Sequence, residues 1–140
     1  MNLACRCAVA ACAIATTGAA FPTLAQGRPQ VDLQCEAIAA GPRLDCRVRL
    51  ATRAGAPIDG AAVTLGATMP SMPMVHAVVP AATRPTGIPG EYRGALDLEM
   101  SGVWAIQVDI AGPLRDRVVR TLRAEECTST PRCPALPAKR

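Results

Sequence analysis

Apolar and polar residues alternate along most of the chain, in short stretches that end at Gly, Pro or Asp. Alternation with a period of two is typical of β-strands with one buried face, and no stretch shows a convincing helical repeat. We therefore expect strands at residues 30–38, 43–52, 61–68, 73–80, 91–98, 103–110 and 116–124. Short strands at this spacing predict an all-β domain of about seven strands, built as an antiparallel sandwich or barrel.

Two stretches indicate which residues form the core. In "EYRGALDLE" the apolar Tyr92 and Leu96 differ in parity from the charged residues, and in "VWAIQVDI" Trp104 and Ile106 share one face. Tyr92 and Trp104 are the only aromatic residues after the first 25 positions. The core must therefore be filled mainly by aliphatic side chains around Trp104. A core of this size favours stabilisation by disulfides.

The first 25 residues have the layout of an export signal. Arg6 precedes an apolar run at 7–21, which is followed by Pro22 and small residues, so we expect cleavage before Gln26. The run of about 15 residues is shorter than the roughly 20 needed to span a membrane as a helix. We therefore predict a periplasmic or secreted protein.

Two alternatives concern the same segment. An uncleaved N-terminus would leave the protein anchored in the membrane, and "VAAC", which ends at Cys12, superficially resembles a lipoprotein cleavage box. With cleavage before Gln26, we expect one domain at 26–126 and a Pro-rich, disulfide-closed tail at 127–140.

Four cysteines follow the expected signal, and an even number in an exported domain usually means disulfides. If residues 40–41 form a two-residue turn, Cys35 lies directly opposite Cys46, which is close enough for a cross-strand bridge. We therefore pair Cys35 with Cys46, and Cys127 with Cys133. The alternative is a link from the first hairpin to the last strand.

Charge and composition exclude some classes of function. The formal net charge is +4, but the basic residues are scattered and only 2% of residues are aromatic. A nucleic-acid-binding protein would need clustered cations and aromatic stacking platforms. We therefore expect no nucleic-acid partner.

The sequence also does not favour an enzyme. His76 is the only histidine, and no Gly-x-Ser-x-Gly motif supplies a nucleophile. Asp97 and Glu99 share a strand face, but paired carboxylates on a wet face usually serve solvation. We therefore expect no catalytic residues.

The stretch "TMPSMPMVHAV" at 68–78 contains three of the five methionines and the single histidine. On a strand, Met72, Met74 and His76 would project from the same side about 7 Å apart. Thioethers suit Cu(I), and imidazole accepts either copper state. This pattern predicts an open copper(I) site, with Met69 and Met100 as further candidate ligands.

Other interpretations of this stretch remain open. Methionines also line partner-binding surfaces or fill cores. The opposite parity of Val75, Ala77 and Val79 makes these the better core residues, which favours exposed sulfurs. Pro70 and Pro73 cannot donate to a ladder, so we expect an edge strand that would be accessible to a metal or a partner.

Three segments together carry a resemblance to a known family: "GAPIDGAAVTL", "MPSMPMVHAV" and "GEYRGALDLEMSGVWAIQVDI". With Gly90, Tyr92, Gly102 and Trp104 in two Gly-x-aromatic motifs, residues 55–110 resemble the FixH/YtkA-like family of small exported or membrane-anchored bacterial domains. The resemblance implies an immunoglobulin-like antiparallel β-sandwich. Relatives of FixH take part in assembling copper-dependent respiratory oxidases, and YtkA-like domains occur beside metal-efflux components.

Two functional hypotheses follow. The first is a noncatalytic copper-handling protein that binds Cu(I) transiently and exchanges it with a copper donor or acceptor protein or a membrane complex. The second is a metal-free immunoglobulin-like interaction module that docks onto a membrane or respiratory complex through the same edge strand. The oligomeric state does not follow from the sequence.

Overall fold

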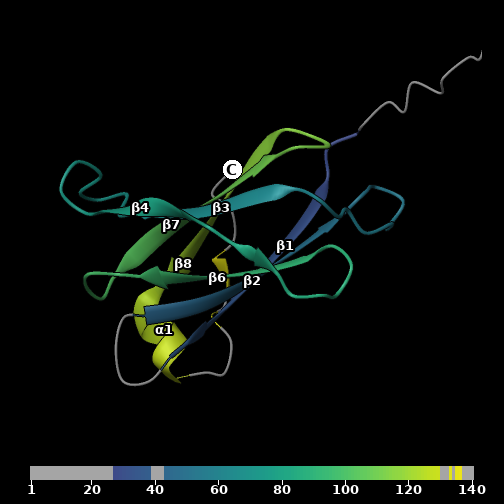
Figure 1. Cartoon of the computed structure of the whole chain (residues 1–140). Coiled ribbons are helices and arrows are strands. Elements are labelled where there is room, and N and C mark those ends of the chain that lie inside the picture. The colour runs from purple at the N-terminus through teal and green to yellow at the C-terminus, as the bar shows by residue number, and fades with distance from the viewer. Residues whose placement is uncertain (1–26, 39–42, 130–132, 134, 137–140) are drawn as a thin grey trace, which may run out of the picture.

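The alternating stretches form the strands of two packed sheets (Figure 1). The computed structural model describes residues 27–38, 43–129, 133 and 135–136. In chain order the elements are β1 (Gln30–Ala37), β2 (Arg43–Ala51), β3 (Ala62–Thr68), β4 (Ala77–Ala82), β5 (Arg84–Pro85), β6 (Glu91–Asp97), β7 (Val103–Ala111), β8 (Asp116–Arg123), α1 (Ala124–Ser129) and β9 (Ala135–Leu136).

The order of the strands identifies the fold class. One antiparallel sheet has the order β1-β2-β6-β5 and the other β4-β3-β7-β8-β9. An immunoglobulin domain places strands A, B, E and D in one sheet and C, F and G in the other. Here β1, β2, β6 and β5 occupy the first set of positions, β3, β7 and β8 the second, and β4 is an added edge strand beside β3. The predicted immunoglobulin-like sandwich is confirmed.

Most of the predicted strand bounds agree with the structure to within one residue. The exception is the strand predicted at 73–80, since β4 begins only at Ala77. Helix α1 was not predicted, because six residues are too few to show a helical repeat. The two-residue strands β5 and β9 likewise leave no periodic pattern in the sequence.

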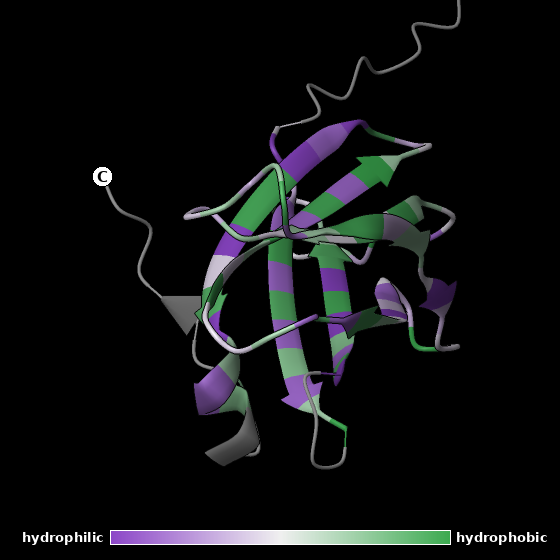
Figure 2. Ribbon diagram, turned by 90° about the vertical axis from the view of Figure 1, so that its left-hand side faces the viewer, coloured by the Kyte–Doolittle hydropathy of each residue, from purple (hydrophilic) through white to green (hydrophobic). Residues whose placement is uncertain are grey.

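The core lies between the two sheets and is lined by alternate residues of each strand. Figure 2 shows this alternation as purple and green bands along the ribbons. Trp104 on the central strand β7 is fully buried, and Tyr92 on β6 is also buried. The other large side chains that are fully buried are aliphatic: Leu44, Val48 and Leu50 on β2, Leu65 on β3, Leu96 on β6, and Ile106, Val108 and Ile110 on β7.

Both expected disulfides are formed. Cys35 and Cys46 are register partners on β1 and β2, and both side chains are buried in the core. Cys127 on α1 pairs with Cys133, whose backbone N–H donates to the carbonyl of Cys35 at 2.9 Å. The second disulfide and this hydrogen bond therefore hold α1 and Cys133 together beside β1. Two disulfides are consistent with an exported protein.

The Gly-x-Tyr motif holds the connection between β2 and β3. The hydroxyl of Tyr92 donates to the carbonyl of Ile58 at 2.9 Å and accepts from the N–H of Ala61 at 3.0 Å. Gly90 has a φ of +71°, and its N–H donates to Oδ1 of Asp59 at 2.7 Å. A Cβ atom at Gly90 would lie 2.6 Å from the carbonyl oxygen of Leu50, so only glycine fits there.

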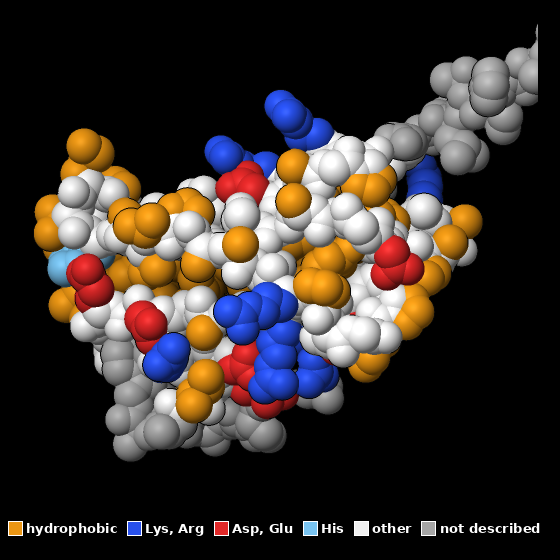
Figure 3. All heavy atoms as spheres, viewed as in Figure 1, with side chains coloured by type: hydrophobic (Ala, Val, Ile, Leu, Met, Phe, Trp, Pro, Cys, Tyr) orange, Lys and Arg blue, Asp and Glu red, His pale blue; other side chains and the backbone are white. Residues whose placement is uncertain are grey.

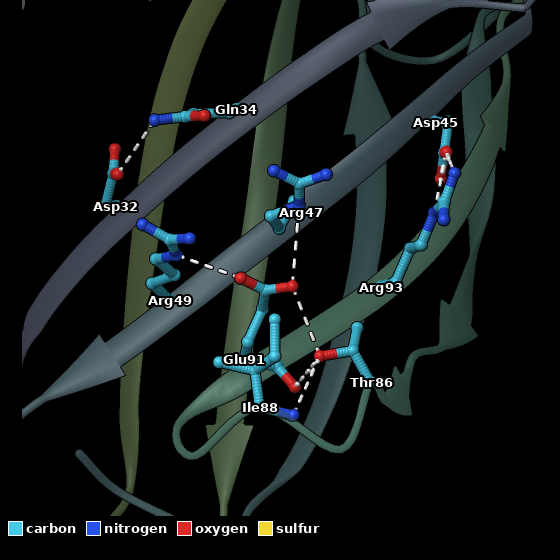
Figure 4. Close-up of polar contacts among 9 residues, drawn as sticks. All are labelled: Asp32, Gln34, Asp45, Arg47, Arg49, Thr86, Ile88, Glu91 and Arg93. Carbon is cyan, nitrogen blue, oxygen red and sulfur yellow. Dashed lines mark hydrogen bonds and ion pairs between the residues drawn. The ribbon is translucent and has the colours of Figure 1, made fainter.

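An ion-pair cluster covers the outer face of the first sheet (Figure 4). The Glu91 carboxylate is buried under Arg49 at 2.9 Å and Arg47 at 3.5 Å, and it accepts from the Thr86 hydroxyl at 3.1 Å. The alternation correctly predicts the outward face of Glu91, but its burial depends on these neighbours. The hydrogen bond from Arg49, supported by Thr86 and Arg47, lowers the pKa of Glu91 against the opposing effect of its burial.

Some predictions lie outside the described residues. These are the signal segment at 1–25, its alternative cleavage at Cys12 and the turn at 40–41. The boundary predicted after residue 126 stays a prediction, and α1 runs across it. In the part of the chain that the structure describes, no helix has the length and apolar character needed to cross a membrane.

We predict that Gly90→Ala lowers the free energy of unfolding by more than the roughly 1–2 kcal/mol that a left-handed backbone costs an L-residue. The extra loss comes from the contact with the Leu50 carbonyl. Gly55→Ala is the matched control, because Gly55 has a φ of +87° and nothing within 4 Å of its Cβ position. Urea denaturation of both variants measures the difference, and equal losses would contradict this account.

We predict that the Glu91 cluster contributes stability that is lost in acid. Because the pKa of Glu91 is lowered in the folded state, this stability is complete above the unfolded pKa of about 4.3 and disappears as the pH falls through the folded pKa. Glu91→Gln should therefore flatten the acid limb of stability against pH. Arg49→Gln should flatten it as well, because loss of the largest stabilising contact brings the folded-state pKa of Glu91 closer to its unfolded value. Unfolding curves with parallel acid limbs for all three proteins would show that the cluster has no such role.

Candidate functional site

The methionine-rich segment is the loop between β3 and β4 and is not a strand. The N–H of Met69 donates to the carbonyl of His76 at 3.1 Å and closes the loop. Inside it, the N–H of Met72 donates to Met69 at 3.0 Å, and those of Val75 and His76 donate to Met72 at 3.1 Å. The strand predicted at residues 73–76 is therefore wrong, and with it the alternation that placed Met72, Met74 and His76 on one strand face.

Two prolines explain why this segment forms a loop and not a strand. Pro70 and Pro73 have fixed φ angles and no N–H, so the segment cannot continue the β3–β4 ladder and closes as turns instead. The edge strand begins after the loop, at Ala77: β4 pairs with β3 and forms one edge of its sheet. The predicted parity of β4 is also wrong, because Val78 packs against the core while Val79 is 81% exposed.

The candidate ligands fall into two groups. Met74 is 94% exposed, and Met72 and Met100 are about 42% and 40% exposed. Met69 is only 4% exposed. Its Cε atom lies 3.0 Å from the position that a Cβ atom would occupy at Gly102. The structure thus gives Met69 a packing contact at the base of the loop, whereas the other three methionines are exposed residues.

His76 is held by a carboxylate on a second loop. Its Nδ1 lies 2.6 Å from Oε2 of Glu99, which follows the end of β6. A carboxylate only accepts hydrogen bonds, so in the neutral imidazole this contact places the proton on Nδ1 and leaves the lone pair on Nε2. Among the described residues Nε2 makes no hydrogen bond. Histidines that bind metals usually donate their other ring N–H to a carboxylate in this way.

The loop between β6 and β7, residues 98–102, is held by two hydrogen bonds to its backbone. The indole N–H of Trp104 donates to the carbonyl of Met100 at 3.1 Å. The backbone N–H of Ala124 donates to the carbonyl of Gly102 at 2.9 Å. Gly102 has a φ of +132°. The Gly-x-Trp motif therefore shapes the loop that carries Glu99 and Met100, and Figure 1 shows both loops at the left-hand end of the sandwich.

The donor types gathered at this end are mainly soft. Figure 3 shows hydrophobic side chains around the pale-blue histidine at the left-hand end of the molecule. The described residues contain no group of three or more His, Cys, Asp and Glu side chains that could hold a metal ion. A metal bound here would therefore need the thioethers of Met72, Met74 or Met100 beside the imidazole.

Sequence reasoning missed Glu99 as a partner of His76. The carboxylate shared a parity with Asp97 and was interpreted as a solvated group. The two residues are 23 positions apart, and only the packing of the two loops brings them together. The one local signal for Glu99 in the sequence is its position directly before Met100, a candidate ligand.

An open hollow of about 540 Å³ lies at the opposite end of β3 from this loop. Its lining residues are Ala62, Thr64, Asp109, Ile110, Ala111, Arg115, Asp116 and Arg117. Asp109 and Arg117 form an ion pair with each other. None of the candidate ligands lines this hollow.

We predict that Met69 and Met74 differ sharply in their effect on stability. Met69→Ala removes a buried side chain and should cost about 2–5 kcal/mol, whereas Met74→Ala should change the free energy of unfolding by less than about 0.5 kcal/mol. Chemical denaturation of the two variants checks this. Similar losses would show that Met74 is packed in solution.

Comparison with models of known families gives a match over residues 25–109 to the YtkA-like family. Searches of characterised proteins and of solved structures gave no match. The match includes both glycine–aromatic motifs and the β3–β4 loop, and it covers more than half of the chain. The chain therefore belongs to the YtkA-like family.

Proposed function

We propose that the protein is a noncatalytic copper-handling protein that binds Cu(I) transiently through Met72, Met74, His76 and Met100. The contact between His76 and Glu99 carries the proposal, because it leaves Nε2 of a neutral imidazole without a hydrogen-bond partner among the described residues, in the same loop as the exposed Met72 and Met74. Thioether sulfur and neutral imidazole are ligands suited to Cu(I).

Six side chains of the two loops have different parts in this proposal. Met72, Met74 and Met100 supply sulfur, and His76 supplies Nε2. Glu99 orients the imidazole and keeps the proton on Nδ1. Met69 supports the base of the loop from within the core and is left out of the ligand set because it is buried.

The exposure of the site supports exchange of copper over storage. Met74 projects almost entirely into solvent, and the loop lies at one end of the sandwich (Figure 3). A partner can therefore approach the metal directly. The partner we propose is a copper donor or acceptor protein, or a membrane complex, in the periplasm or outside the cell. Thioethers suit such a compartment, because the four cysteines in the described chain are already consumed in disulfides.

A second candidate function rests on β4. Among the described strands it pairs only with β3, so its other edge has no strand partner there. Val79 is exposed on it, and residues 60–83 contain no Asp, Glu, Lys or Arg. An uncharged edge of this kind can accept a strand of a partner without any metal, as in an immunoglobulin-like interaction module.

We predict stoichiometric Cu(I) binding in a competition titration of the disulfide-bonded protein against a chromophoric chelator. Met72→Ala/Met74→Ala and His76→Ala should abolish or strongly weaken binding, and Met100→Leu should weaken it. Glu99→Gln should lower the affinity about 10- to 100-fold, because it removes the carboxylate partner of His76 without removing a proposed ligand.

Val79→Ala is the control, because Val79 is exposed on β4 but supplies no ligand. Its Cu(I) affinity should equal that of the unchanged protein. Absent binding, or binding that none of the loop substitutions alters, would contradict the copper proposal. The β4 edge would then be tested by capture of membrane proteins with the unchanged protein and with Val79→Lys, whose charge blocks strand pairing.

A further inference from the structure

The oxidisable side chains of the described chain are unequally protected. The four cysteines are in disulfides, and Trp104 and Tyr92 are buried. Met74, Met72 and Met100 are exposed to 94%, 42% and 40% as residues. An oxidant in solvent therefore meets these sulfurs before any other reactive group of the described chain.

We propose that Met74 and Met72 form a reversible oxidation site, at which conversion to the sulfoxide switches off metal binding. The oxidant is hypochlorous acid or hydrogen peroxide. A lone pair of the thioether sulfur attacks the electrophilic oxygen, and an S–O bond forms as the O–Cl or O–O bond breaks. Chloride and the hydroxyl proton leave in the first case, and water leaves in the second. Sulfur loses two electrons and the oxidant gains them.

The chemical consequence is a change of ligand type. A thioether is a soft, polarisable donor, whereas a sulfoxide is polar and presents oxygen to a metal. Cu(I) prefers the soft donor, so oxidation removes the ligands while the chain stays intact. This regulatory step rests on the copper-binding function proposed above, whereas the order in which the methionines oxidise does not.

The structure separates the reactive sulfurs from the structural one. Met69 is buried against Gly102 at the base of the same loop. Met74 is almost fully exposed, so a polar oxygen on its sulfur enters solvent and displaces no core contact. Oxidation of the exposed methionines should therefore leave the sandwich folded, and reduction by a dithiol-driven methionine sulfoxide reductase should restore the thioether and release water.

The test is stepwise oxidation of the disulfide-bonded protein with hypochlorous acid, followed by peptide mass spectrometry, near-UV circular dichroism and Cu(I) competition titration. We expect Met74 to oxidise first, Met72 and Met100 later, and Met69 only on unfolding. Cu(I) binding should be lost in step with the sulfoxides at 74 and 72, with an unchanged Trp104 signal, and should return after the reductase.

Val119→Met is the matched control, since it places a thioether on an exposed position of β8 away from the loop. Its oxidation should add nothing to the loss of binding. Oxidation of Met69 alongside Met74, or full Cu(I) affinity after conversion of both loop methionines, would overturn the inference. If the disulfide-bonded protein binds no Cu(I) before any methionine is oxidised, the proposed function and the regulatory step are both overturned.

Discussion

Trp104 brings an indole N–H into the centre of a core that is otherwise aliphatic, and that group must find an acceptor there. Its acceptor is the carbonyl of Met100, in the loop that precedes β7. This bond places the loop between β6 and β7 against the end of the sandwich. Glu99 lies on that loop, and through Glu99 the position of His76 on the neighbouring loop is also determined. Two hydrogen bonds, from Trp104 to Met100 and between His76 and Glu99, thus connect the core to the exposed loop.

The residues that resemble the family and the residues that could bind a ligand have different tasks. Gly90 and Tyr92 anchor the β2–β3 connection, and Gly102 and Trp104 shape the β6–β7 loop. None of these four has an exposed donor atom that would suit a metal. They keep the frame constant, so the exposed side chains of the β3–β4 loop can serve chemistry without carrying stability.

The parts of the fold that depend on local alternation could be predicted from the sequence. The register that places Cys35 opposite Cys46 follows from counting residues on either side of the first turn, and the inward face of β7 follows from its parity. The β3–β4 loop was mistaken for a strand because its Met and Val residues alternate, while Pro70 and Pro73 prevent the ladder. The contact of His76 with Glu99 and the burial of Glu91 depend on side chains from distant segments, so no local pattern contains them.

Among the described residues, the two disulfides join cysteines that are consecutive along the chain. For a chain that emerges from a membrane channel N-terminus first, Cys35 and Cys46 appear together long before Cys127. Oxidation in the order of emergence then produces the native pairs, because each cysteine meets its partner before a competing thiol arrives. The β1–β2 hairpin is closed while the rest of the chain is still being delivered, so it can serve as the first surface on which the later strands assemble. In a chain delivered in this order, pairing each cysteine with the one that emerged just before it already gives the native connectivity.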